Sequence, residues 1–221
     1  MNLTDELLGE TWYWAAWAVW IPVFAQCVLR APWRRLQDAE HLNVWLGMIV
    51  FLTLVWSMKA GVRPGLTFHL LGANLFALVV GPRLAFVGLS LVTLGITVNG
   101  AAGPLSFAAN ALLLGGCGVA ISQYLSTWLL RVLPSNFFIY VFINGFMVAG
   151  VTVIGIGALS TLLFGLGEVY PWEYLLKEYS PYFILLAFSE AWLSGMVLTL
   201  LVVYRPQWVV SFDDSRYLSD K

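Results

Sequence analysis

The stretch GVRPGLTFHLLGANLFALVVGP, residues 61–82, decides how the rest of the chain is arranged. It holds an apolar run of about fifteen residues, Leu66 to Val80, which is closed by Gly81-Pro82 and carries His69 near its start. Fifteen helical residues rise only about 22 Å, less than the roughly 30 Å of a bilayer's hydrocarbon core. Irregular backbone at membrane depth is tolerated only where protein or a water-filled cavity satisfies it. We therefore expect a short or broken helix here, entered through Pro64-Gly65, and take it as the candidate binding site.

The composition is that of a membrane protein. Of the 221 residues, 60 % are hydrophobic and only 10 % are charged, whereas a soluble domain has about one quarter charged residues. We therefore expect membrane lipid to be the solvent. The net charge is −1 and there is no basic run, so nucleic acid is not expected as a partner. Cys27 and Cys117 stand alone in apolar segments, which favours a packing role for both.

Seven apolar stretches are separated by polar or Gly/Pro-rich segments, and they predict an all-α integral membrane protein with about seven transmembrane helices. A single transmembrane domain is expected over residues 1–210, followed by a short polar tail over 211–221. The acidic opening MNLTDELLGE lacks the positive start of a signal peptide, so Met1 is expected to be the mature start or close to it. The stretches are about Thr11–Leu29, Leu42–Met58, Leu66–Val80, Leu84–Val98, Leu105–Leu130, Phe137–Leu166 and Tyr182–Tyr204.

The distribution of Lys and Arg predicts the orientation. Cytoplasmic segments carry an excess of these residues, and with the N-terminus outside, the inner side holds eight of them and the outer side three. We therefore expect the C-terminus in the cytoplasm, with the chain crossing the membrane several times. Met1 and His69 then face the same exterior side. The inner residues are Arg30, Arg34, Arg35, Arg83, Arg131, Arg205, Arg216 and Lys221, and the outer ones are Lys59, Arg63 and Lys177.

His69 has two interpretations. It is either a polar residue hydrogen-bonded between helices or a ligand for a metal or substrate, because ionisable groups within spans usually face a functional interior. An imidazole suits nickel, copper, zinc or cobalt. The other histidine, His41, lies in a charged loop and is expected to be solvated.

Other polar residues inside the spans have a structural default and a functional alternative. Glu190 is the one carboxylate well inside an apolar stretch, and it is either anchored by Ser or Asn partners or takes part in ion passage. For the amides of Asn74, Asn99, Asn110 and Asn144, hydrogen bonding between helices is the default. No nucleotide loop GxxxxGK[ST], HExxH or GxSxG motif is present, so we expect a non-enzyme whose ATP-driven work is done by other chains.

The block Gly65-Leu-Thr-Phe-His69-Leu-Leu-Gly72-Ala-Asn74 resembles the histidine-containing helix of the CbiM/NikM family. These are the substrate-binding membrane components of energy-coupling-factor transporters for cobalt and nickel, a class of ABC transporter. The likeness covers nearly the whole chain. Further matching blocks are Asn99-Gly100 with Ala108-Ala109-Asn110, then Ser189-Glu190-Ala191, Ser194-Gly195 and Tyr204-Arg205-Pro206.

The resemblance implies a metal site made by the N-terminus. In that family the ion is bound by the Met1 amine, by the backbone nitrogen and imidazole of residue 2, and by the histidine equivalent to His69. This chain has Asn2 instead of histidine, and an amide is a poor donor to nickel or cobalt. Either the site survives with water or the Asn2 oxygen completing it, or the metal has been changed or lost.

The resemblance also implies a location in the bacterial inner membrane, and it implies partners, namely a transmembrane coupling subunit and two cytoplasmic ATPases. The leading hypothesis is therefore a substrate-capture component of a transition-metal importer, with an outward-facing site at Met1, Asn2 and His69. The alternative keeps the fold but assigns it a regulatory or assembly role, or the uptake of a non-metal solute. No cofactor is expected, because the ion is the transported substrate.

Overall fold

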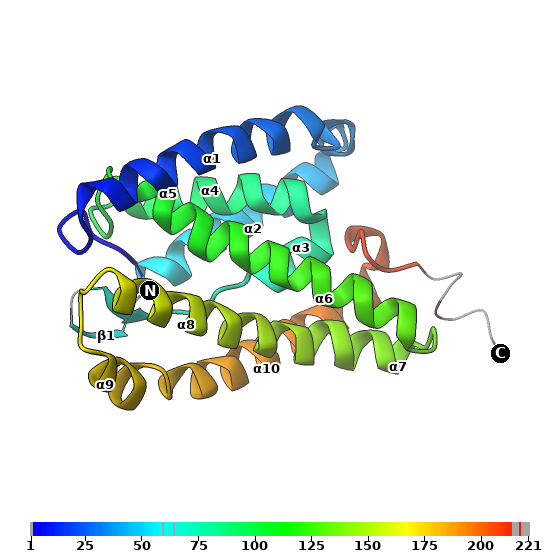
Figure 1. Ribbon diagram of the computed structural model, residues 1–221. Helices are drawn as coiled ribbons and strands as arrows, with labels where there is room; N and C mark the ends of the chain where they lie inside the picture. The colour runs from blue at the N-terminus through cyan, green and yellow to red at the C-terminus, as the bar shows by residue number, and fades with distance from the viewer. Residues whose placement is uncertain (1, 59, 64, 214–216, 218–221) are drawn as a thin grey trace.

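The structure is a computed structural model that describes residues 2–58, 60–63, 65–213 and 217. Most of it is helical, and the long helices lie side by side along one direction (Figure 1). The longer helices are α1 (Glu10–Arg30), α2 (Ala39–Ser57), α4 (Pro82–Val98), α6 (Gly118–Val132), α8 (Val148–Leu166) and α10 (Tyr182–Tyr204). The shorter elements are η1 (Trp33–Gln37), β1 (Ala60–Arg63), β2 (Leu66–Phe68), α3 (Ala73–Val80), α5 (Phe107–Asn110), η2 (Ala111–Cys117), α7 (Phe137–Tyr140), η3 (Val141–Met147), α9 (Trp172–Tyr174), η4 (Leu175–Tyr179) and η5 (Pro206–Trp208).

Among the described residues, five helical stretches are long and apolar enough to cross a membrane. They are Glu10–Arg30, Ala39–Ser57, Phe107–Val132, Phe137–Leu166 and Tyr182–Tyr204, and the last two match the predicted bounds. Two of the five, 107–132 and 137–166, each contain a π-helical segment near their start, η2 and η3. Pro82–Val98 is a shorter apolar helix. The predicted class, a helical membrane protein, agrees with these lengths; the count of seven spans and the orientation stay predictions.

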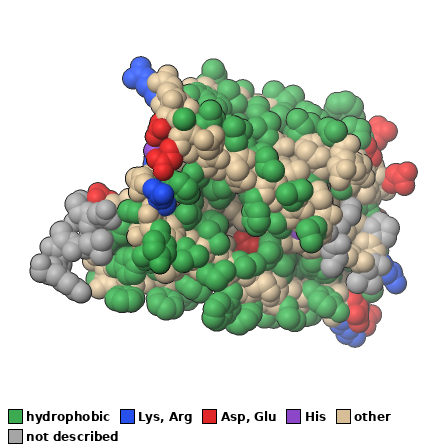
Figure 2. All heavy atoms as spheres, turned by 180° about the vertical axis from the view of Figure 1, so that it is seen from behind, with side chains coloured by type: hydrophobic (Ala, Val, Ile, Leu, Met, Phe, Trp, Pro, Cys, Tyr) green, Lys and Arg blue, Asp and Glu red, His purple; other side chains and the backbone are tan. Residues whose placement is uncertain are grey.

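The outer surface of the bundle is hydrophobic, as the composition predicts. Large apolar side chains such as Leu29 and Val98 are 83 % and 81 % exposed. Acidic and basic side chains gather at the two ends of the molecule, and hydrophobic ones cover most of the face between them (Figure 2). This distribution suits a bundle whose middle contacts lipid acyl chains.

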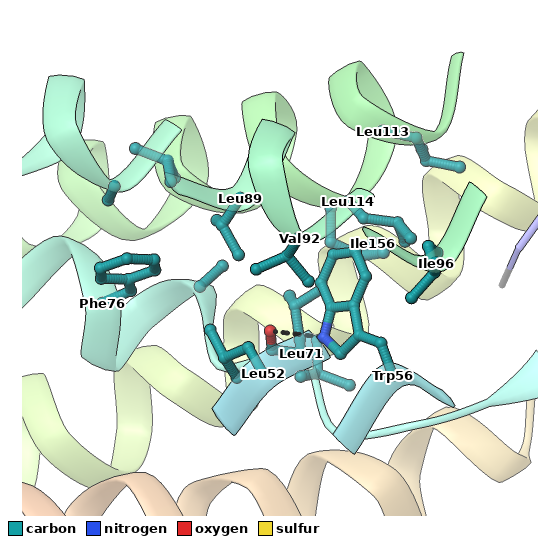
Figure 3. Packing of buried hydrophobic residues seen from close by; sticks show 14 of the residues in the cluster. Leu52, Trp56, Leu71, Phe76, Leu89, Val92, Ile96, Leu113, Leu114 and Ile156 are labelled. Carbon is teal, nitrogen blue, oxygen red and sulfur yellow. Dashed lines mark hydrogen bonds between the residues drawn. The ribbon is translucent and has the colours of Figure 1, made fainter. Parts of the chain in front are cut away.

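The core surrounds α3 and α4, which lie inside the bundle, while α1 lies at its edge (Figure 1). In α3 every residue except Leu75 is buried, whereas in α1 only Tyr13 is. Phe76 of α3 and Leu89 and Val92 of α4 belong to the cluster of fully buried side chains shown in Figure 3. The segment that follows His69 is therefore in the most enclosed part of the fold.

The third apolar stretch is broken, as its length predicts. The prediction that His69 lies near the start of a helix in this stretch was wrong. Only Ala73–Val80 is helical, and these eight residues rise about 12 Å. Leu66–Phe68 instead forms an antiparallel hairpin with Ala60–Arg63, so the expectation of a purely helical chain misses this element. His69 lies in the irregular segment between β2 and α3. The helix begins only after Gly72, whose φ of 68° is a left-handed conformation that favours glycine.

The chain after α10 folds back and supports the end of α3. Helix α3 stops at Gly81, with φ of 85°, and Pro82 at once begins α4, so its last carbonyl groups lack helical partners. The backbone N–H groups of Val210 and Ser211 donate to the carbonyls of Val79 and Leu78 at 3.0 and 3.2 Å. The predicted division of the chain at residue 210 stays a prediction.

Candidate functional site

The N-terminal arm, residues 2–8, begins inside the bundle, although Glu6 is exposed. Asn2 and Leu3 are 1 % and 0 % exposed. The Leu3 backbone N–H donates to Oδ1 of Asn110 at 2.8 Å, and Nδ2 of Asn110 donates back to the Leu3 carbonyl at 3.0 Å. One amide from the span 107–132 therefore satisfies both backbone groups of Leu3, as a neighbouring strand would.

Further contacts hold the rest of the arm. The hydroxyl of Ser106 donates to the Leu3 carbonyl at 2.9 Å, and the Ser106 backbone N–H donates to Oδ1 of Asp5 at 2.7 Å. Farther along, the Tyr13 hydroxyl donates to the carbonyl of Thr4 at 2.5 Å and accepts from the N–H of Leu8 at 3.1 Å. The polar groups of the arm are thus paired with the first helix and with the loop before α5.

Asn2 and His69 meet at the end of the arm. Oδ1 of Asn2 lies 3.0 Å from Nε2 of His69, and the imidazole is 4 % exposed. The Asn2 backbone N–H donates to Oγ1 of Thr67, two residues before the histidine, at 3.1 Å. The structure therefore brings together two of the three residues proposed for the site, while Met1 lies outside the described residues.

The hydrogen bonds of the imidazole determine which nitrogen carries its lone pair. Nδ1 of His69 lies 3.1 Å from the carbonyl oxygen of Leu70, which can only accept, so Nδ1 carries a proton. In a neutral ring Nε2 then has the lone pair, which faces the Asn2 amide. Nδ2 of Asn2 is buried without a hydrogen-bond partner among the described residues, and turning the amide by 180° would direct it to Nε2. The lone pair that would bind a metal thus points at residue 2.

The irregular segment 69–72 is held from two opposite helices. The indole of Trp56 packs against the imidazole, with ring centroids 4.8 Å apart. Figure 3 shows the hydrogen bond that the indole N–H donates to the Leu71 carbonyl at 3.2 Å. From α10, Oε2 and Oε1 of Glu190 accept the backbone N–H groups of Leu71 and Gly72 at 2.8 and 2.6 Å. Sequence reasoning did not place Glu190 near His69.

The Glu190 carboxylate is 2 % exposed and lies beside a cavity of about 100 Å³ between α2 and α10. The serine partner expected for it is present, because the Ser194 hydroxyl donates to Oε1, although at 3.4 Å. Its shorter hydrogen bonds are to the backbone N–H groups of Leu71 and Gly72, and no sequence motif indicates such contacts.

The remaining amides occupy different environments. Asn74 makes the expected bonds between helices: its Nδ2 donates to the Asn144 carbonyl at 2.8 Å, and its Oδ1 accepts from the Ser122 hydroxyl at 2.7 Å. The Asn144 side chain is fully buried, and neither of its polar atoms has a partner among the described residues. Asn99 is exposed at the end of α4. Asn110 holds the N-terminal arm, as described above.

A cation at this place would find one imidazole nitrogen and one amide oxygen among the described side chains. Within that part of the chain, no group of three His, Cys, Asp or Glu side chains is arranged to hold a metal ion. An amide oxygen is a harder donor than an imidazole nitrogen. The described residues thus supply a partial, mixed N/O donor set.

Comparison with known proteins gives a matching sequence family and similar folds among solved structures. The family described as the cobalt uptake substrate-specific transmembrane region (CbiM) matches residues 2–208. A crystal structure of a truncated transition metal transporter aligns with a TM-score of 0.76 and 16 % identity, covering 92 % of this chain and 99 % of that one. A second transition metal transporter aligns with a TM-score of 0.75 and 18 % identity, covering 91 % and 92 %. A search among curated proteins finds no significant match.

Proposed function

Because the chain belongs to the CbiM family of cobalt-uptake transmembrane proteins, we propose that it is the substrate-capture component of a transition-metal importer. It binds nickel or cobalt near the outer face, between the N-terminus and His69. In this proposal it crosses a bacterial inner membrane seven times with its N-terminus outside. A transmembrane coupling subunit and cytoplasmic ATPases on separate chains supply the energy.

One observation carries the proposal: Asn2, at the start of the chain, lies 3.0 Å from the buried imidazole of His69. An N-terminal segment without such a role would be expected to lie at the surface. Here residues 2 and 3 are instead enclosed and hydrogen-bonded to residues 67, 106 and 110. This arrangement supports ion capture by backbone and side-chain groups of the first residues together with one imidazole.

Titration of the purified protein in lipid nanodiscs with Ni²⁺ and Co²⁺, followed by calorimetry, tests the proposal. The chain has two histidines, so His41→Ala is a matched control for His69→Ala. The prediction that His41 lies in a loop was wrong: it lies in the first turn of α2, at the opposite end of that helix from Trp56, which packs against His69. We expect His69→Ala, and separately a tag fused to the N-terminus, to weaken binding at least tenfold, while His41→Ala leaves the affinity unchanged. Unchanged affinity in both altered proteins would remove the proposed site.

The contact between Asn2 and His69 also favours a second candidate. The amide is hydrogen-bonded to the nitrogen that an ion would use, which describes a closed bundle whose metal site has been lost or changed. Asn2→His separates the two candidates. If the natural protein binds no ion and Asn2→His gains binding, the fold serves a regulatory or assembly role, or takes up another solute.

A further inference from the structure

The segment that carries His69 has no secondary structure of its own between β2 and α3, so its backbone groups depend on side chains from elsewhere. The Leu70–Leu71 peptide unit is the centre of this arrangement. Its carbonyl oxygen accepts from Nδ1 of His69 at 3.1 Å, and its N–H donates to Oε2 of Glu190 at 2.8 Å. A single peptide group thus connects the carboxylate to the imidazole.

The second carboxylate oxygen fixes the next peptide. The N–H of Gly72 donates to Oε1 of Glu190 at 2.6 Å. Each of the two neighbouring N–H groups donates to a different oxygen, and a carboxylate offers two such acceptor oxygens where an amide offers one. Burying a carboxylate in a bundle is costly, and neither of the two ion pairs among the described residues involves Glu190. The two backbone N–H donors are therefore the main groups that compensate the burial of this carboxylate.

We propose that Glu190 is a positioning residue for the ion-binding imidazole, acting through the Leu70–Leu71 peptide. This inference rests on the proposed function. An anionic acceptor on the peptide N–H polarises the peptide and makes its carbonyl a stronger acceptor. The carbonyl holds the proton of His69 on Nδ1 and leaves the lone pair on Nε2, facing Asn2. Histidine ligands of metals are commonly fixed in this way by a carboxylate or a carbonyl, which also raises their basicity.

The packing around the peptide agrees with this role. Trp56 donates to the Leu71 carbonyl on the other side of the segment, and its ring restricts rotation of the imidazole. At Gly72 a Cβ atom would overlap the side chain of Leu52, so α2 packs closely against the segment at this residue. The peptide that links Glu190 to His69 is therefore held in one orientation.

The test measures the histidine directly, without relying on metal. In ¹⁵N-histidine-labelled protein carrying His41→Ala, the remaining imidazole signals belong to His69 alone, because the chain has only two histidines. We expect Nδ1 to be protonated and Nε2 unprotonated. In Glu190→Gln the preference for that tautomer falls, and Ni²⁺ or Co²⁺ affinity drops 10- to 100-fold. Glu190→Asp, which is one methylene shorter, should shift the tautomer in the same direction.

Two control variants separate positioning from general destabilisation. Ser194→Ala removes only the 3.4 Å contact to Oε1. Leu198→Ala opens a cavity farther along α10, where the fully buried side chain packs near Gly145 rather than against the His69 segment. Both should leave the tautomer and the metal affinity within about threefold of the natural protein, whatever their effect on thermal stability.

The outcomes are distinguishable. An unchanged His69 tautomer in both Glu190 variants overturns the inference, and so does a shift of equal size in Leu198→Ala. If the natural protein binds no metal but Glu190→Gln still shifts the tautomer, the capture function fails while Glu190 remains the residue that orients the imidazole.

Discussion

Because Asn110 bonds both backbone groups of Leu3, we predict that its replacement releases the N-terminal arm. Replacing Asn110 by leucine keeps the size of the side chain but removes its donor and its acceptor. The Leu3 N–H, bonded to Oδ1 at 2.8 Å, then loses its partner in a place where Leu3 is 0 % exposed. The Leu3 carbonyl keeps the Ser106 hydroxyl at 2.9 Å, so the main loss is one buried donor.

Leaving a buried N–H unpaired costs about 1–3 kcal/mol. Taking about 2 kcal/mol, the equilibrium between the docked and the released arm shifts about 30-fold toward release. Metal affinity responds less if docking is strong, because it falls only in proportion to the fraction of molecules whose arm is docked. Exchange of the arm's backbone amides responds in full, since it depends on the free energy of local opening.

Hydrogen–deuterium exchange of residues 3–8, measured by mass spectrometry in nanodiscs, is therefore the assay. We expect exchange about 30-fold faster in Asn110→Leu. The control is the same change at Asn43, an exposed asparagine of α2. If exchange of the arm stays within threefold of the natural protein while the helices exchange normally, then Asn110 does not hold the arm and the reasoning is refuted.

Three further predictions follow from local contacts. In Gly103→Ala the new Cβ would overlap the Asp5 carboxylate, so the arm should exchange faster, as in Asn110→Leu; unchanged exchange would show that the loop adjusts. The hydrogen bond from His41 lowers the pKa of Asp38. The ionised Asp38 therefore stabilises the start of α2 at pH values above the ordinary pKa of aspartate, and this stabilisation is lost as the pH falls through the lowered pKa. His41→Ala should move this loss to higher pH, measured by NMR titration of the Asp38 carboxyl carbon, and an unchanged midpoint would contradict it. Calorimetry of Asn2→Ala tests the role of the amide. If the amide oxygen is a ligand, the variant should bind metal more weakly. If the ion must instead break the hydrogen bond of the amide, worth about 1 kcal/mol, the variant should bind metal about fivefold more tightly.

The positions of the long helices could be predicted from the sequence because lipid-exposed apolar runs have a minimum length. The stretch 137–166 was placed correctly at both ends, and the brevity of the third stretch correctly indicated a break. The hairpin of β1 and β2 could not be predicted. Its second strand, Leu66–Phe68, is as apolar as the helix that follows, and a short apolar run does not distinguish strand from helix.

The site could be predicted only in part, for a physical reason. Burial of His69 follows from an ionisable residue in an apolar run, and the family resemblance suggested the N-terminus as its neighbour. The role of Glu190 depends on which backbone N–H groups lack partners, and that depends on where α3 begins. Asn110 likewise bonds to backbone rather than to a side chain of matching type. Contacts to backbone leave no pattern of residue types in the sequence.

Asn2 lies at the nitrogen of His69 that an ion would bind. In our proposal Glu190 acts through the Leu70–Leu71 peptide to leave the lone pair of His69 on Nε2. The Asn2 amide lies against that same nitrogen. Glu190 also satisfies the N–H groups of Leu71 and Gly72, which is a structural task whether or not an ion binds. Entry of an ion requires the Asn2 amide to move, and losing its one side-chain hydrogen bond to the described residues costs about 1 kcal/mol. Metal affinity in Asn2→His and Asn2→Ala, measured beside the His69 tautomer in Glu190→Gln, therefore decides between a changed site and a lost one.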